Sequence, residues 1–145
     1  MSILKVENLV AGYGSITALK GISLHVDKGE IATLIGANGA GKTTLLNTIS
    51  GLIPAREGTI TFDGEDITRL SPDKIVRKGI VQVPEGRQIF SELSVLDNLR
   101  MGAYVRNKKD DYTPELEKVF TIFPKLKERM HQKGGSLSGG EQQML

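Results

Sequence analysis

The nine residues "GANGAGKTT", positions 36–44, decide the class of fold. They match the pattern G-x-x-x-x-G-K-[ST], with the apolar stretch Ile31–Ile35 before them and the helical run "KTTLLNTISG" from Lys42. A strand, a glycine-rich loop and a helix in this order form a phosphate-binding loop. The glycines let backbone N–H groups curl round a phosphate, and the helix N-terminus adds roughly half a positive charge. The stretch therefore predicts an α/β protein of the P-loop NTPase type.

The side chains of this loop have separate expected roles. Lys42 is expected to reach the β- and γ-phosphates, and the Thr43 hydroxyl to bind Mg²⁺, which also bridges the phosphates. A phosphate loop alone does not name a reaction, because kinases, GTPases and motor ATPases share it. The complete set of predicted ATP-binding residues in the loop is Gly36, Asn38, Gly39, Ala40, Gly41, Lys42, Thr43 and Thr44.

The flanking sequence predicts strands first and then alternating strands and helices. "GISLHVDKGE" alternates apolar and polar residues and turns at 27–29, which predicts a hairpin that leads into a buried strand at 31–35. The loop helix should end at Gly51, and "GTITFDGEDI" should form a strand with a turn at Asp63 and Gly64. "SPDKIVRKG" predicts a helix between Ser71 and Gly79, followed by the strand "IVQV" at 80–83.

The pattern becomes helical from Ser94 onward. "SVLDNLRMGAY" and "TPELEKVFTIFPKLKERM" are each expected to be one helix, the second with Thr113 as N-cap. "RNKKDD" is expected to be a solvated loop. We predict a nucleotide-binding core with an antiparallel β subdomain at 1–93 and a helical subdomain at 94–145. The apolar face of the second helix is formed by Leu116, Val119, Phe120 and Phe123.

"LSGGEQQ", residues 137–143, predicts a second anion site. Ser138 is placed to cap the following helix, while Gly139 and Gly140 allow a phosphate to approach the backbone. One chain needs only one phosphate cradle for each ATP. This second anion site is therefore expected to bind the ATP of a partner subunit.

Three stretches together resemble the ATP-binding subunit of ABC transporters: "AGYGSITAL", "GANGAGKTT" and "LSGGEQQ". The resemblance covers the whole chain and implies that Tyr13 stacks on adenine, although Tyr13 alone would be read as an ordinary turn aromatic. It also implies that Ser138, Gly139, Gly140 and Glu141 bind ATP across a head-to-tail dimer with a like or different ATPase subunit. The cofactors implied are ATP and Mg²⁺.

Further stretches, "VPEGRQIFSELSVLDNL" and "IFPKLKER", resemble the LivF-type ATPase subunit of branched-chain amino acid importers. That resemblance implies ATP hydrolysis coupled to import through membrane-spanning permease subunits, with the ATPase on the inner face of the cell membrane. Glu85 stands where most ABC ATPases have a glutamine that helps to hold Mg²⁺. Glu85 is a possible Mg²⁺ ligand or a hinge marker, since an ionised carboxylate cannot donate a hydrogen bond. Arg87 is equally compatible with a membrane-partner contact and with solvent exposure.

We call residues 138–141 the signature and the helix that follows Ser138 the signature helix. The family's water-activating residues follow this helix and are expected beyond Leu145. This chain therefore resembles the first half or so of an ATPase with an incomplete core. We expect the 145 residues alone to be inactive. Two alternatives stay open: a non-hydrolysing nucleotide-binding module, and the ATPase of a related urea or amide importer. The signature disfavours a kinase. The transported amino acid and the partner ATPase are not given by the sequence.

The composition excludes several other classes of site. There is no cysteine, which excludes disulfides and thiolate metal sites, and the two histidines, His25 and His131, are too isolated for a metal cluster. The net charge of +2 arises from interspersed basic and acidic residues, which argues against a nucleic-acid partner. The first residues carry a lysine and a glutamate and so do not resemble a signal peptide. A cytosolic location is expected.

Overall fold

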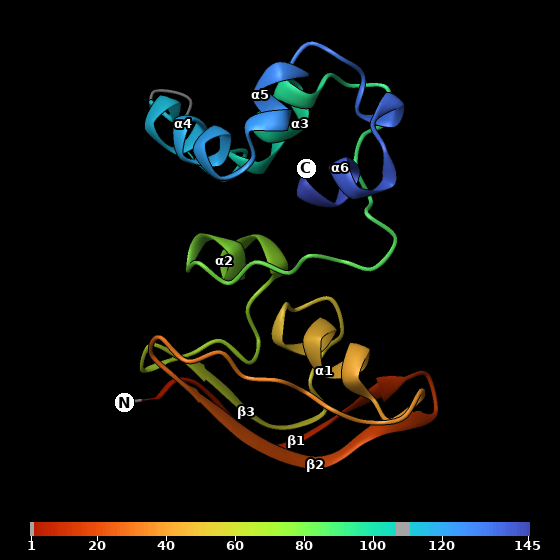
Figure 1. The fold of residues 1–145 in the computed structure, drawn as a ribbon. Coiled ribbons are helices and arrows are strands. Elements are labelled where there is room, and N and C mark those ends of the chain that lie inside the picture. The colour runs from red at the N-terminus through yellow and green to blue at the C-terminus, as the bar shows by residue number, and fades with distance from the viewer. Residues whose placement is uncertain (1, 107–110) are drawn as a thin grey trace. The chain divides into compact units, whose positions relative to one another are not determined.

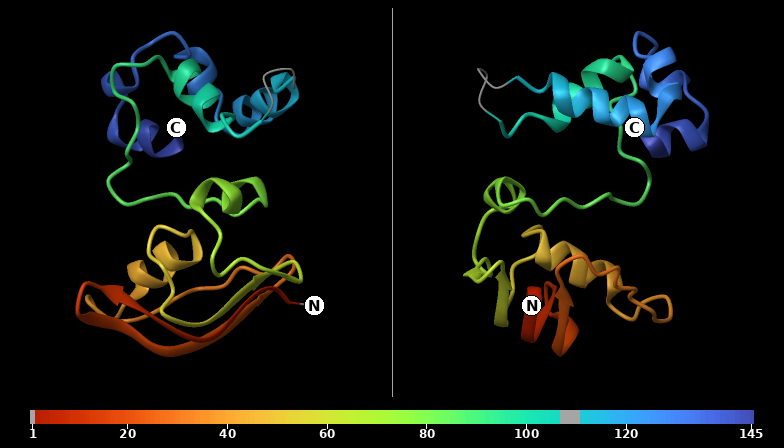
Figure 2. Two further views of the ribbon diagram at one scale, coloured as in Figure 1. Left: turned by 180° about the vertical axis from the view of Figure 1, so that it is seen from behind. Right: turned by 60° about the vertical axis from the view of Figure 1, so that its left-hand side comes forward.

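A computed structural model describes residues 2–106 and 111–145. The contacts divide the chain into two compact units, residues 1–82 and 83–145 (Figures 1 and 2). The predicted boundary after Leu93, between the nucleotide-binding core and the helical subdomain, stays a prediction. The central part of the expected solvated loop "RNKKDD" lies outside the described residues.

The first unit is built on an antiparallel sheet. Its strands are β1 (Ser2–Tyr13), β2 (Ile16–Asp27), β3 (Glu57–Phe62) and β4 (Glu65–Asp66), in the order β2-β1-β3-β4. The predicted turn between β3 and β4 is confirmed: Asp63 and Gly64 have φ of 48° and 81°, the two left-handed residues that a tight hairpin turn requires.

Helix α1 (Lys42–Ile49) packs on this sheet (Figure 1). Leu45 and Ile49 of the helix join buried strand residues such as Leu9 and Ile60 in one hydrophobic cluster. The helix ends as predicted, because Gly51 has φ of 74° and its left-handed conformation stops the helical ladder. Helix α2 (Pro72–Arg77) begins after Ser71 and is followed by left-handed Gly79, also as predicted.

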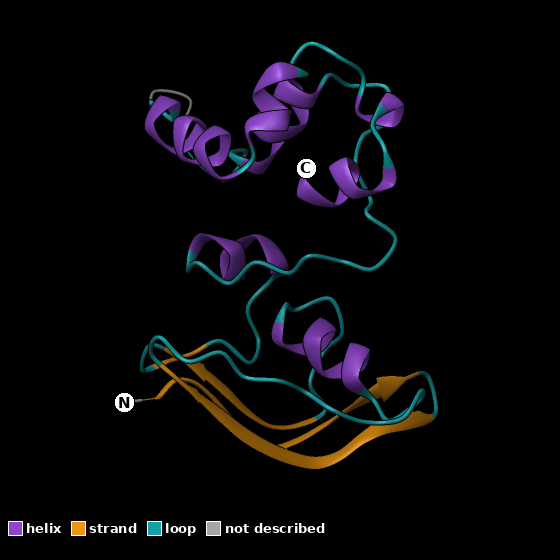
Figure 3. Cartoon of the chain, in the orientation of Figure 1, coloured by secondary structure: helices purple, strands orange, loops and turns teal. Residues whose placement is uncertain are grey.

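Two predicted strands, at 31–35 and 80–83, are wrong for the chain as described. Both segments are drawn as loops in Figure 3, and Ile31 and Val81 are 96% and 73% exposed. A strand exists only through hydrogen bonds to a neighbouring strand. Neither segment has such a neighbour among residues 2–106 and 111–145. Their apolar, β-branched composition fits a buried strand, but composition cannot supply the pairing.

The second unit is helical, with α3 (Val95–Gly102), α4 (Thr113–Ile122), α5 (Pro124–Glu128), the short 3₁₀ turn η1 (Gly134–Ser136) and α6 (Gly139–Met144). Its core holds Val95, Phe120, Leu126 and Leu137. The single helix predicted from Thr113 is corrected: Tyr112 is the N-cap, and the helix breaks at Phe123. The residue before a proline avoids helical backbone, so Pro124 starts a new helix instead of extending α4.

Candidate functional site

The loop before α1 has the backbone that a phosphate cradle needs. Gly39 and Gly41 have φ of 85° and 92°, a region that other residues rarely adopt. A turn closes the loop through the Ala40 N–H, which donates to the Ala37 carbonyl at 3.1 Å. Gly41 is the N-cap of α1 and has no side chain with which to cap the helix. The N–H groups of the first turn of α1 are therefore not covered by a capping side chain at this position.

Lys42 folds back over its own loop. Its Nζ donates to the carbonyl oxygens of Gly36 and Ala37 at 2.7 and 2.8 Å. The ammonium group is therefore held across the mouth of the loop by two neutral acceptors. A phosphate oxygen is a stronger acceptor because the hydrogen bond is charge-assisted.

The two threonines after Lys42 differ in exposure. The Thr43 side chain is exposed, whereas Thr44 is buried with only 5% exposure, and its carbonyl accepts from the Thr48 hydroxyl at 2.7 Å. An exposed hydroxyl at the start of α1 fits the expected Mg²⁺ ligand. Among the described residues, no group of three or more acidic or histidine side chains could hold a metal by itself. Mg²⁺ usually keeps several waters and binds phosphate oxygens beside one or two protein ligands, so a single exposed hydroxyl is compatible with this ion.

The β1–β2 hairpin adjoins the phosphate loop. A Cβ added at Gly41 would lie 2.9 Å from Leu19 Cδ2 and 3.2 Å from the Ala18 carbonyl oxygen, so the loop backbone touches β2. The register pairs Leu19 with Ala11 and Ile16 with Tyr13 at the hairpin tip. Tyr13 therefore lies about 7 Å along β1 from this point of contact, at about 3.3 Å per residue. Its side chain is 51% exposed.

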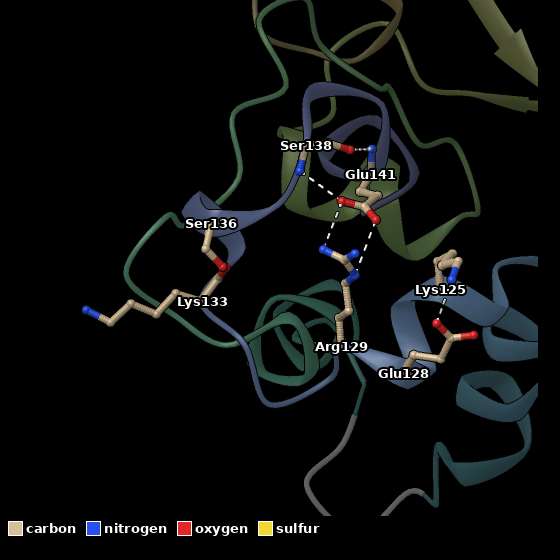
Figure 4. A network of polar contacts seen from close by, with 7 residues as sticks. All are labelled: Lys125, Glu128, Arg129, Lys133, Ser136, Ser138 and Glu141. Carbon is tan, nitrogen blue, oxygen red and sulfur yellow. Dashed lines mark hydrogen bonds and ion pairs between the residues drawn. The ribbon is translucent and has the colours of Figure 1, made fainter.

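The signature helix α6 begins with a complete capping box (Figure 4). The Ser138 hydroxyl accepts a hydrogen bond from the Glu141 N–H at 3.3 Å, and the Ser138 N–H donates to Glu141 Oε2 at 2.9 Å. Ser138 is thus confirmed as the N-cap. Because the hydroxyl acts as an acceptor in this contact, it keeps its own proton for a further bond.

Arg129 holds the other side of the Glu141 carboxylate. Its Nε lies 3.3 Å from Oε1, and its Nη1 donates to Oε2 at 3.4 Å. The hydrogen bonds from the Ser138 N–H and hydroxyl hold the pKa of Glu141 below its ordinary value, and the nearby positive charges of Arg129 and Lys125 act in the same direction. The Glu141 carboxylate is therefore held by contacts within its own chain, and its expected role toward a partner's ATP stays a prediction.

Arg87 lies against the signature. A Cβ added at Gly139 would be 2.9 Å from its Nη1, so the guanidinium group covers this glycine. The backbone around it is unusual, because Arg87 and Gln88 have φ of 64° and 24°. The sequence singled out Arg87 but could not indicate Gly139 as its neighbour. Glu85, two residues earlier, is exposed, and its role stays a prediction.

The predicted site residues fall into two groups. The loop residues 36–44 and Tyr13 belong to the first unit, and Glu85 and the signature residues 138–141 belong to the second. Two arginines that complete these groups, Arg56 beside the hairpin tip and Arg129 beside Glu141, were missed from sequence. Arg56 lies outside the quoted motifs, and Arg129 ends the stretch "IFPKLKER" without a predicted role. Each reaches its partner through the fold rather than through sequence spacing.

The protein-family model described as ABC transporter matches residues 19–145. A branched-chain amino acid transport ATP-binding protein of Pseudomonas aeruginosa, BraG, is 50% identical over 99% of this chain and 61% of its own length. The LivF protein of Archaeoglobus fulgidus is 35% identical over 99% of the chain and 60% of its own length. The chain thus spans about three fifths of the length of these relatives.

Solved structures agree with this result. A nucleotide-free ATP-binding cassette from an ABC transporter superposes with a TM-score of 0.78 at 35% identity, covering 98% of this chain and 61% of that one. A dimeric bacterial ABC transporter cassette gives a TM-score of 0.76 at 26% identity, covering 97% and 66%. With the phosphate loop and the capped signature helix, these matches show that the chain belongs to the ABC transporter family, as an ATP-binding cassette subunit.

Proposed function

We propose that the intact protein binds Mg·ATP through residues 36–44 and hydrolyses it as a dimer to energise a transporter. The observation that carries the proposal is the phosphate loop itself: left-handed glycines, a helix start without a capping side chain, and the Lys42 ammonium group poised at its mouth. All three favour an oxyanion at the same place.

The residues divide the work as follows. Backbone N–H groups of the loop and Lys42 would hold the β- and γ-phosphates, the Thr43 hydroxyl would hold Mg²⁺, and the exposed Tyr13 ring would stack on the adenine. Bound Mg²⁺ would neutralise charge on the phosphates and orient them. Glu85 remains a candidate for a further contact with the metal.

The signature residues Ser138, Gly139, Gly140 and Glu141 would serve the ATP of a partner cassette. The dimeric structure of a related cassette supports a two-subunit assembly. One cradle in each chain then closes over the nucleotide held by the other. Such a pair would contact membrane-spanning permease subunits from the cytoplasmic face. The helices in residues 2–106 and 111–145 are too short or too polar to span a bilayer themselves.

The proposed cargo is a branched-chain amino acid. The relative with 50% identity is named for that transport, whereas a lipopolysaccharide export ATPase of Escherichia coli, LptB, is 37% identical. The difference favours the amino acid branch. Which amino acid is carried would depend on the other subunits of the transporter.

Calorimetric titration of the intact protein with Mg·ATP tests the central part of this proposal. Lys42→Ala removes the ammonium group and should weaken binding about 10- to 100-fold, the usual effect of losing hydrogen bonds to a charged group. Lys28→Ala, which removes an exposed lysine from the turn after β2, is the matched control and should bind as the wild type does. Unchanged ATP affinity in a folded Lys42→Ala protein would refute nucleotide binding by this loop.

A further inference from the structure

We infer that Arg56 positions the base-binding hairpin, and so helps to set the affinity for the base of the nucleotide rather than for its phosphates. The inference rests on the proposed function, in which Tyr13 stacks on adenine. It begins from three contacts that a single side chain makes with one turn.

Arg56 holds the tip of the β1–β2 hairpin. One terminal nitrogen, Nη2, donates to the carbonyl of Gly14 at 2.7 Å and to that of Ile16 at 3.4 Å, and the other, Nη1, donates to the Thr17 hydroxyl at 3.0 Å. These acceptors follow Tyr13 directly in the chain. A planar guanidinium group fixes several acceptors in one relative orientation, which a flexible ammonium group cannot do.

The tip needs such support because the third strand does not reach it. The pairing of β1 with β3 ends at Val10 and Glu57, while β1 continues to Tyr13. Beyond Val10 the sheet is therefore a ribbon of two strands, an arrangement that is marginally stable in water. Arg56 lies at the end of this ladder and spans the gap.

The backbone of Arg56 is itself fixed. Its N–H donates to the Val10 carbonyl at 2.8 Å, and the preceding residue, Ala55, is buried at 7% exposure. The side chain thus extends from the sheet and core of the first unit. It transmits that rigidity to the turn, rather than joining two mobile segments.

The hairpin tip is also closely packed against itself. A Cβ added at Gly12 would lie 2.0 Å from the Ile16 carbonyl oxygen, the same oxygen that accepts from Arg56. The two strands are therefore in close contact at this point, and Tyr13 follows Gly12 directly. A shift of the turn would carry the Tyr13 ring with it, away from Ala18 and Leu19 of β2, which touch the phosphate loop at Gly41.

The test separates the base from the phosphates. The intact protein and its variants Tyr13→Ala, Arg56→Ala and the double variant are titrated with Mg·ATP and with Mg·tripolyphosphate, which has no base. Tyr13→Ala should weaken ATP about 5- to 100-fold, as for loss of one stacked base, and Arg56→Ala about 3- to 10-fold. Tripolyphosphate affinity should be unchanged in all of them, which also shows that the loop remains folded.

The ATP affinity of the double variant is the most specific test of the positioning role. If Arg56 acts through Tyr13, the double variant should bind ATP within about twofold of Tyr13→Ala alone. Lys20→Ala, which removes an exposed cation from the same hairpin, is the control and should bind both ligands as the wild type does.

The outcomes are distinct. Wild-type ATP affinity in Arg56→Ala, an equal loss of tripolyphosphate binding, or losses that add in the double variant would each overturn the positioning role. Wild-type ATP affinity in Tyr13→Ala would also overturn it, while nucleotide binding by the phosphate loop would stand. Failure of the wild type itself to bind Mg·ATP would refute the proposed function.

Discussion

The phosphate loop and the signature both place glycines at a helix start, yet they satisfy the helix in different ways. Helix α1 begins at left-handed Gly41, which has no side chain, whereas α6 begins at Ser138 with a complete capping box from Glu141. The start of α1 has no capping side chain, whereas the start of α6 is capped within its own chain. We therefore expect the loop to bind a ligand by itself, and the signature to be stable by itself and to bind only together with a second subunit.

The glycines should show this difference most strongly. Gly41→Ala places a side chain at φ of 92° and against Leu19, so it should destabilise the intact protein by roughly 1–3 kcal/mol from backbone strain and crowding. Gly140→Ala meets nothing within 4 Å among the described residues and lies in a helix. It should leave stability unchanged or raise it by up to about 1 kcal/mol. Urea unfolding measures both.

The same pair of variants separates stability from function. Gly140→Ala should lose ATP-dependent dimerisation despite its stability, because a methyl group would stand where the partner's phosphate is expected. Equal destabilisation by the two alanines would show that the two helix starts do not differ as described.

The Ser138 cap should contribute an intermediate amount. Ser138→Ala removes the acceptor for the Glu141 N–H and should cost about 1 kcal/mol of stability, the usual effect of losing an N-cap. Ser94→Ala is the matched control, because Ser94 caps α3 by accepting from the Asp97 N–H at 3.0 Å. Chemical denaturation should give similar losses for both. No loss in Ser138→Ala alone would mean that the box does not stabilise α6.

The smallest effect expected is the pH dependence of Glu141. Its pKa is lowered in the folded protein, so its ionised contacts stabilise the fold above the ordinary value of 4.5, and this contribution is lost as the pH falls through the lowered value. The stability difference between wild type and Glu141→Gln should therefore be largest near neutral pH and shrink on acidification below 4.5. A difference that grows with acidification would contradict the ionised contact with Arg129.

Sequence reasoning succeeded where neighbouring residues determine the structure. Local signals predicted the helix start after Ser94, the helix start at Ser71 and Pro72, and the turn at 63–64, and the structure has all three. The break before Pro124 also had a local signal, which the apolar periodicity of the segment obscured. The phosphate loop was recognised from the spacing of its residues, and the signature was recognised from its resemblance to a known family.

Sequence reasoning failed where the partner lies far along the chain. Residues 31–35 have the composition of a strand but no strand to pair with among the described residues. Arg56 reaches Gly14 and Thr17 across about forty residues of chain, and Arg129 reaches Glu141 from the preceding helical segment. Such contacts exist only after the sheet and the helices have formed, so no local pattern reveals them.

The most direct test of the difference between the two helix starts compares Lys42→Ala with Ser138→Arg in the intact protein on a hydrolysis-deficient background. Calorimetry measures ATP binding to the monomer, and light scattering measures ATP-dependent dimerisation. Ser138→Arg should bind ATP almost as the wild type does but fail to dimerise, because the added side chain crowds the partner's γ-phosphate, whereas Lys42→Ala should lose both. If Ser138→Arg still dimerises on ATP, or loses monomer binding as completely as Lys42→Ala does, the signature does not act across the interface.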